Sequence, residues 1–188
     1  MKLSPRLIRR VSATAAAVAA AVLIPAVALA APGRAARPAA PGCGQAQLQA
    51  WIGLPASAAA GTVYYQLEIS NISARTCTLL GFPGVSAVDG NGTQLGSPAQ
   101  RDHSYPVRLL TLARGATAHV ELGIGTAENY PVPACHPVAA SGLRVFAPGD
   151  FRSETIPFPD FHACRTAGPK LLIVSPVLAG TGIPHFSH

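Results

Sequence analysis

The four cysteines are the residues whose type and spacing most clearly define a chemistry. Cys43, Cys77, Cys135 and Cys164 could form disulfides or bind a metal ion. No two of them have the Cys-x-x-Cys spacing of a zinc site, whereas an even number in an exported chain is typical of disulfides. Three connectivities are open. We favour Cys43–Cys77 with Cys135–Cys164, because each bridge then closes a short loop of about 30 residues.

Two histidines near the second cysteine pair suggest a metal site. His136 follows Cys135 directly and His162 lies just before Cys164, so the favoured pairing would bring both imidazoles close together. With Asp160 they would form a His-His-carboxylate set. The alternative is two exposed imidazoles beside a disulfide, since nothing in the spacing forces the three side chains to converge. We expect no other cofactor.

The chain has no recognisable motif for nucleophilic catalysis. The Gly-x-Ser-x-Gly turn that carries the nucleophile in α/β-hydrolases is absent. Serines, histidines and aspartates occur, but without a motif their presence indicates no catalytic triad. We therefore predict a protein without enzymatic activity, and keep an unrecognised secreted hydrolase as an alternative.

Several phenylalanines could form a binding surface. Phe151, Phe158 and Phe161 lie in a proline-broken segment that is too irregular for a central strand and too apolar for an ordinary loop. Phe82 lies in a Gly-Phe-Pro-Gly turn. Exposed together, these four rings would offer an apolar patch to a partner. The alternative is that they cover an end of the folded core.

Alternating apolar residues predict the strands that position these groups. In residues 63–71, Val63, Tyr65, Leu67 and Ile69 share one face of an expected strand. Residues 118–124 alternate in the same way. Six further short strands are predicted at residues 48–52, 78–80, 85–88, 107–112, 143–146 and 171–174, separated by Gly- and Pro-containing turns. About eight short strands predict an all-β fold, an immunoglobulin-like antiparallel β-sandwich.

The distribution of charge argues against a nucleic-acid partner. The chain of 188 residues has a formal charge of +6, but six of its 14 basic residues precede Cys43. The remaining eight are scattered and are balanced by eight acidic residues. Binding to a phosphate backbone requires clustered cations.

The amino-terminal segment predicts export. Residues 1–30 combine a basic start, an alanine-rich apolar stretch and a small-residue cleavage site at Ala28-Leu29-Ala30, as in a secretory signal peptide. An uncleaved membrane anchor is the alternative. We expect residues 31–42 to be an Ala/Pro-rich linker, residues 43–180 the β-sandwich domain, and residues 181–188 a flexible tail. No transmembrane segment is predicted after cleavage.

One stretch of the chain resembles a known family. The run Cys77-Thr78-Leu79-Leu80-Gly81-Phe82-Pro83-Gly84-Val85 is its most specific part, and Leu112-Ala113-Arg114-Gly115, Cys135 and Cys164 follow in order. Residues 43 to about 176 are similar to the actinobacterial secreted domain of unknown function 4232 (DUF4232). The resemblance implies an exported, disulfide-bonded β-sandwich and supplies no activity. Arg114 stands where such sequences often have proline.

Together these observations predict a secreted or cell-envelope module that binds a protein or envelope partner without catalysis. We expect a monomer. The first alternative is an extracytoplasmic metal-binding protein that uses His136, His162 and Asp160.

Overall fold

The all-β class is confirmed. The computed structural model describes residues 39–159 and 161–182. Within them lie fourteen strands, two short 3-10 helices, η1 (Gln45–Gln47) and η2 (Ala127–Asn129), and one four-residue helix, α1 (Val132–Cys135). The predicted signal peptide and residues 31–38 of the predicted linker lie outside the described residues.

The largest sheet has six strands. Their order is β1 (Leu48–Ala59), β2 (Thr62–Asn71), β8 (Thr117–Gly125), β13 (Leu172–Val174) and β6 (Gln100–Arg101), with β14 (Leu178–Ala179) also paired to β8. All of these pairs are antiparallel except β13 with β6, which is parallel. The predicted antiparallel arrangement therefore has one exception at the sheet edge.

The pairing of β2 with β8 explains the two clearest sequence patterns. Leu67 lies opposite Val120 and Ile69 opposite Ala118, and all four side chains are buried in the core. The alternate residues face the other side of the sheet, where Glu68 lies opposite His119. This second face is not open to solvent along its whole length, because Glu68 is 0% exposed.

The second sheet completes the same core. Its four strands are β11 (Ser153–Pro157), β10 (Gly142–Phe146), β4 (Gly84–Val88) and β5 (Gln94–Leu95), in that order and all antiparallel. Val85 lies opposite Val145 and Ala87 opposite Leu143. These residues belong to one hydrophobic cluster with the inner face of β2 and β8. Burial of this shared apolar surface holds the two sheets together.

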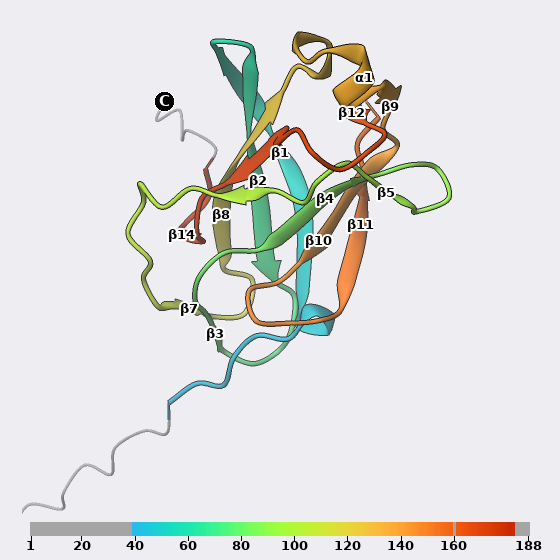
Figure 1. Cartoon of the computed structure of the whole chain (residues 1–188). Helices are drawn as coiled ribbons and strands as arrows, with labels where there is room; N and C mark the ends of the chain where they lie inside the picture. Colours follow the sequence, from blue (N-terminus) through green and yellow to red (C-terminus); the bar gives the residue numbers. More distant parts are fainter. Residues whose placement is uncertain (1–38, 160, 183–188) are drawn as a thin grey trace, which may run out of the picture. The chain divides into compact units, whose positions relative to one another are not determined.

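Two small sheets lie at opposite ends of the domain (Figure 1). At one end β3 (Cys77–Leu79) pairs with β7 (Leu110–Leu112), and at the other β12 (His162–Cys164) pairs with β9 (Pro137–Ala139) next to α1. Each end has one disulfide, Cys43–Cys77 and Cys135–Cys164 respectively. This is the connectivity that the loop lengths favour.

The two ends of the predicted domain differ from expectation. Pro41 accepts hydrogen bonds from the Thr78 backbone and hydroxyl, and Gly42 forms a parallel bridge with Thr78. The last residues of the predicted linker therefore lie against β3. At the other end, Gly182, assigned to the flexible tail, is hydrogen-bonded to Glu68. The remainder of that predicted tail, residues 183–188, is outside the described residues.

Loss of either disulfide should destabilise the domain measurably. Replacing Cys135 and Cys164 by alanine is expected to lower the free energy of unfolding by about 3 kcal/mol, because the unfolded chain gains the entropy of a loop of about 30 residues. In a domain of this size that corresponds to a fall in Tm of about 10 °C. Thermal melts followed by circular dichroism measure it. An unchanged Tm in this variant and in the reduced wild type would contradict a structural role.

Candidate functional site

The four phenylalanines of the predicted binding surface do not form one patch. Phe151 lies in the loop that joins β10 to β11, whereas Phe158 follows the other end of β11. Phe158 and Phe161 pack against the core, but Phe151 is 96% exposed. Phe82 lies in the turn between β3 and β4, beside the strip of chain that includes β6.

Phe82 is surrounded by cationic and aromatic side chains. The guanidinium carbon of Arg101 lies 5.6 Å from the centre of its ring, within the range of a cation–π contact. The His103 ring lies 5.1 Å away. The turn is also tied to the carboxyl-terminal part of the chain, because Val177 donates a hydrogen bond to the Gly81 carbonyl. These contacts give the specific Cys77-to-Val85 motif a structural role.

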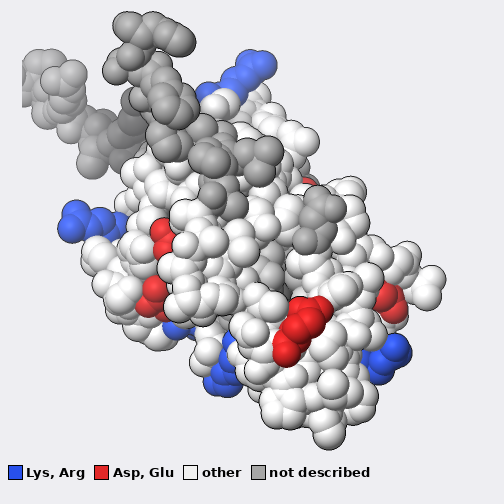
Figure 2. All heavy atoms as spheres, turned by 90° about the horizontal axis from the view of Figure 1, so that it is seen from above, with Lys and Arg blue, Asp and Glu red and all other residues white. Residues whose placement is uncertain are grey.

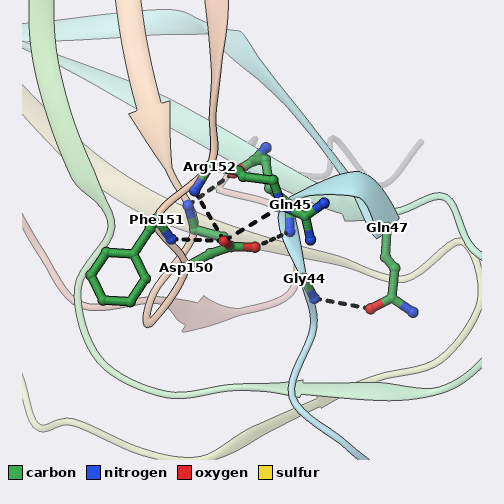
Figure 3. A network of polar contacts seen from close by, with 7 residues as sticks. Gly44, Gln45, Gln47, Asp150, Phe151 and Arg152 are labelled. Atoms are coloured by element: carbon green, nitrogen blue, oxygen red, sulfur yellow. Dashed lines mark hydrogen bonds and ion pairs between the residues drawn. The ribbon is translucent and has the colours of Figure 1, made fainter.

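The backbone that carries Phe151 is held by one carboxylate (Figure 3). Oδ1 of Asp150 accepts hydrogen bonds from the backbone N–H of Phe151 and Arg152, at 2.7 and 3.0 Å, and Oδ2 accepts one from Gln45 at 2.6 Å. The Gln45 N–H, followed by that of Arg152, holds the pKa of Asp150 below its usual value. The hydrogen bond to Gln45 thus fixes the loop to η1, although the two residues are 105 positions apart in the sequence.

An aromatic cluster at the other end of β11 lines a pocket. The Tyr65 and Phe158 rings meet edge to face with centroids 5.0 Å apart, and Phe161 lies 5.7 Å from Phe158. Beside them is a cavity of about 340 Å³. Its walls are formed by the end of the β2–β8 pair, by η2 and by residues around β12. The lining residues are Val63, Tyr65, Ile124, Gly125, Thr126, Ala127, Glu128, Pro159, Phe161 and His162.

A carboxylate and an imidazole form a pair at this pocket. Nδ1 of His162 lies 2.5 Å from Oε1 of Glu128, and both side chains are about half exposed, at 54% and 52%. The hydrogen bond from His162 is the main reason why the pKa of Glu128 lies below its usual value. Glu128 therefore remains a carboxylate at neutral pH. Of the described lining residues, it is the one with a formal negative charge.

The predicted metal set is not assembled by the residues that the structure describes. Asp160 is outside them. His136 ends α1 in a left-handed conformation, and His162 is bonded to Glu128 rather than directed at a shared site. Within residues 39–159 and 161–182 there is no group of three or more His, Cys, Asp or Glu side chains that could hold a metal ion.

The Glu128–His162 pair is not indicated by any sequence pattern. Glu128 follows β8 in a three-residue 3-10 helix, and His162 comes 34 positions later. No motif relates them, because the contact depends on how η2 and β12 pack. Tyr65 was correctly expected on the inner face of its strand, but not as the wall of a pocket.

Charged groups are sparse on the face of the domain that Figure 2 shows. On the face shown in Figure 2, acidic and basic side chains are single and separated by uncharged surface. In the described part of the chain, no helix is both long enough and apolar enough to span a membrane.

Comparison with known proteins identifies one family. The model of a domain of unknown function, DUF4232, matches residues 43–177. This range includes both disulfides, the pocket and the Asp150 network. Searches of the curated proteins and of the solved structures each returned no match.

The two loop phenylalanines should differ in their effect on stability. Because Phe151 is 96% exposed, Phe151→Ala is expected to change the free energy of unfolding by less than about 0.5 kcal/mol. Phe158→Ala removes a ring that packs on the core and should cost about 2–3 kcal/mol. Urea unfolding of both variants measures the difference. An equal loss of unfolding free energy in the two variants would contradict the exposed position of Phe151 and the packed position of Phe158.

The Asp150 network should make stability depend on pH. Because the folded protein depresses the pKa of this carboxyl, its contribution is full above the usual aspartate value of 3.8 and is lost as pH falls through the folded-state pKa. Asp150→Asn should therefore be less stable than wild type at neutral pH, with a difference that shrinks below about pH 4.

Unfolding in urea at several pH values measures this difference. Arg152→Gln is the control, since its Nε lies 3.9 Å from Asp150 on a side chain that is 74% exposed, and such pairs contribute little. A larger loss in Arg152→Gln than in Asp150→Asn would show that the ion pair, not the backbone contacts, holds the loop.

Proposed function

Since the chain belongs to the DUF4232 family, whose function is unknown, we propose that its domain is an extracytoplasmic binding module without catalytic activity. Its ligand is an organic ammonium group on an envelope or extracellular partner. The observation that carries the proposal is the pocket beside Tyr65 and Phe161, with Glu128 at its edge.

The two disulfides support a location outside the cytosol. All four cysteines are paired, and none of them is more than 6% exposed. Disulfides of this kind persist in oxidising compartments, whereas cytosolic thiols are kept reduced. The basic and apolar leader of the sequence agrees with export.

The lining of the pocket favours a cation with an apolar body. The rings of Tyr65 and Phe161 have electron-rich faces that attract cations, and Glu128 provides a full negative charge. Val63 and Ile124 add apolar surface for the rest of the ligand. A volume of about 340 Å³ is at the lower end of the range for small-ligand sites, and fits a side chain or a small amine.

The same lining supports binding rather than catalysis. The described residues around the cavity include a threonine, Thr126, but no serine, cysteine or lysine that could act as an activated nucleophile. The Thr126 hydroxyl donates to the Gly61 carbonyl. Nδ1 of His162 is bonded to Glu128, and the described lining offers its other ring nitrogen no serine, cysteine or lysine to activate.

A set of three phenyl compounds with different head groups tests the ligand class. We expect phenethylammonium to bind the purified protein and to shift NMR signals of Tyr65, Phe161 and Glu128. Phenethyl alcohol should bind about tenfold more weakly and 3-phenylpropionate not measurably, because each step removes or reverses the charge that faces Glu128.

Two variants show whether the pocket is responsible. Glu128→Gln should weaken phenethylammonium binding about tenfold without changing Tm, since its side chain is half exposed. The matched control is Asp89→Asn, which removes one charge from the turn between β4 and β5 and can keep the local hydrogen bonds. Preferential binding of the anion, or equal losses in both variants, would refute the proposal.

A further inference from the structure

Glu68 is a buried carboxyl group that the pocket does not use. Its side chain is 0% exposed and lies on the outer face of the large sheet. Its neighbours across the ladder are Trp51 of β1 and His119 of β8. A glutamate so completely removed from water is rare without a partner for its charge.

The chain between residues 178 and 182, here called the C-terminal strap, is fastened over this face. Its first part, β14, pairs with β8 at His119 and Ala118. Nδ1 of His119 then donates to the Gly180 carbonyl at 2.9 Å, and the Gly182 N–H donates to Oε1 of Glu68 at 2.9 Å. Glu68 therefore holds the far end of the strap.

Two oxygens beside the strap have no hydrogen-bond donor. Among the described residues, the buried side-chain polar atoms without a partner are Oε2 of Glu68 and Oε1 of Gln66. The two residues are two apart in β2, so their side chains share one face. Both lie against Gly182, where an added Cβ would be 2.3 Å from Oε1 of Gln66.

One proton would satisfy both oxygens. Two buried acceptors without a donor cost free energy, and an ionised carboxyl has only acceptors. When the carboxyl is protonated, its O–H becomes a donor that the amide oxygen of Gln66, on the same face of β2, can accept. The other carboxyl oxygen remains available to the Gly182 N–H.

We propose that Glu68 is a proton-binding site, shared with the amide oxygen of Gln66, and that its protonation fastens the C-terminal strap to the sheet. Ionisation places a charge beneath the strap, and the strap must lift to admit water to it. The ligand of this site is the proton, and the device is independent of the pocket around Glu128.

The electrostatic surroundings agree with this assignment. Burial is the main cause that raises the pKa of Glu68 above its usual value, and it outweighs the opposing effects of the Gly182 N–H and of His119. A second acidic residue, Glu121 of β8, lies on the same face of the sheet as Glu68. It is opposite Gln66 and accepts a hydrogen bond from Tyr105. Trp51, on the β1 side, is uncharged.

The sign of the pH dependence follows from the raised pKa. A carboxyl whose pKa is raised by folding stabilises the closed form fully below its usual value of 4.5. That stabilisation disappears as pH rises through the pKa of the closed form. The strap is therefore held most firmly at pH values below the midpoint of the Glu68 carboxyl and is released as the pH rises through that midpoint.

Opening the strap would also change a groove on the same side of the domain. Ala179 and Gly180 line a cavity of about 540 Å³ together with the residues of β7. The exposed side chain of Leu109 lies at this groove. Release of the strap would thereby remove one side of this groove.

NMR of the ¹³C- and ¹⁵N-labelled full chain tests the proposal directly. We expect the Glu68 carboxyl carbon to titrate above the usual glutamate range. The amide of Gly182 should lose about tenfold in protection from hydrogen exchange, corrected for the intrinsic rate, for each pH unit above that midpoint. The fluorescence of Trp51, the single tryptophan of the chain, should follow the same curve.

Glu68→Gln distinguishes this site from other titrating groups. The neutral amide reproduces the protonated carboxyl, with one oxygen for Gly182 and an N–H for Gln66, so Gly182 should stay protected at every pH. Glu121→Gln is the matched control, because it removes a carboxylate from the same face and should leave the Gly182 titration unchanged.

Several results would overturn the proposal. A Glu68 midpoint at or below the usual range in wild type would do so even if the variant failed to fold. So would an unchanged Gly182 titration in Glu68→Gln. A midpoint that shifts when calcium or EDTA is added would assign the site to a metal cation instead of a proton.

Discussion

The register between β2 and β8 is the constraint on which the rest of the structure depends. It places Leu67 against Val120 on one face and Glu68 against His119 on the other. Side chains alternate along a strand, so a shift of one residue would expose the core and bury the polar set. The pocket at Tyr65 and the carboxyl beneath the C-terminal strap are therefore products of one pairing, on opposite faces of the same two strands.

Polar side chains fix the segments that the sheets leave free. Asn71 is 0% exposed, and its amide donates to the carbonyls of Arg75, Leu112 and Ala113, so it joins the end of β2 to the loop after β7. Glu154 accepts from the Ala50 backbone and Asp150 from that of Gln45. Each carboxylate or amide satisfies backbone groups that would otherwise be buried without partners. These hydrogen bonds tie loops to the sheets without contributing much apolar surface.

The sequence predicts the features that arise from the local alternation of apolar residues and from the number of cysteines. β2 and β8 were identified because their two faces differ in polarity, and the disulfides because four cysteines in an exported chain pair. What it could not predict depends on distant contacts. Phe151 and Phe158 share a segment and a residue type, yet only Phe158 packs on the core. Glu68 alternates with the core residues of its strand, and nothing in the sequence indicates that Gly182 bonds its carboxyl. The proline-broken segment is too irregular for a central strand, and in the structure it contains β11, an edge strand that ends at Pro157.

The position of the first disulfide has a mechanical consequence. The chain enters the domain at Gly42, next to Thr78, and the following residue is bonded through sulfur to Cys77. A pulling force applied to the amino-terminal side would cross this covalent bond directly into β3. The intervening strands β1 and β2, which carry the pocket wall and Glu68, lie inside the closed loop of sequence separation 34 and bear no load. A domain tethered at this end could be stretched by its attachment while β1 and β2 are spared the covalent load.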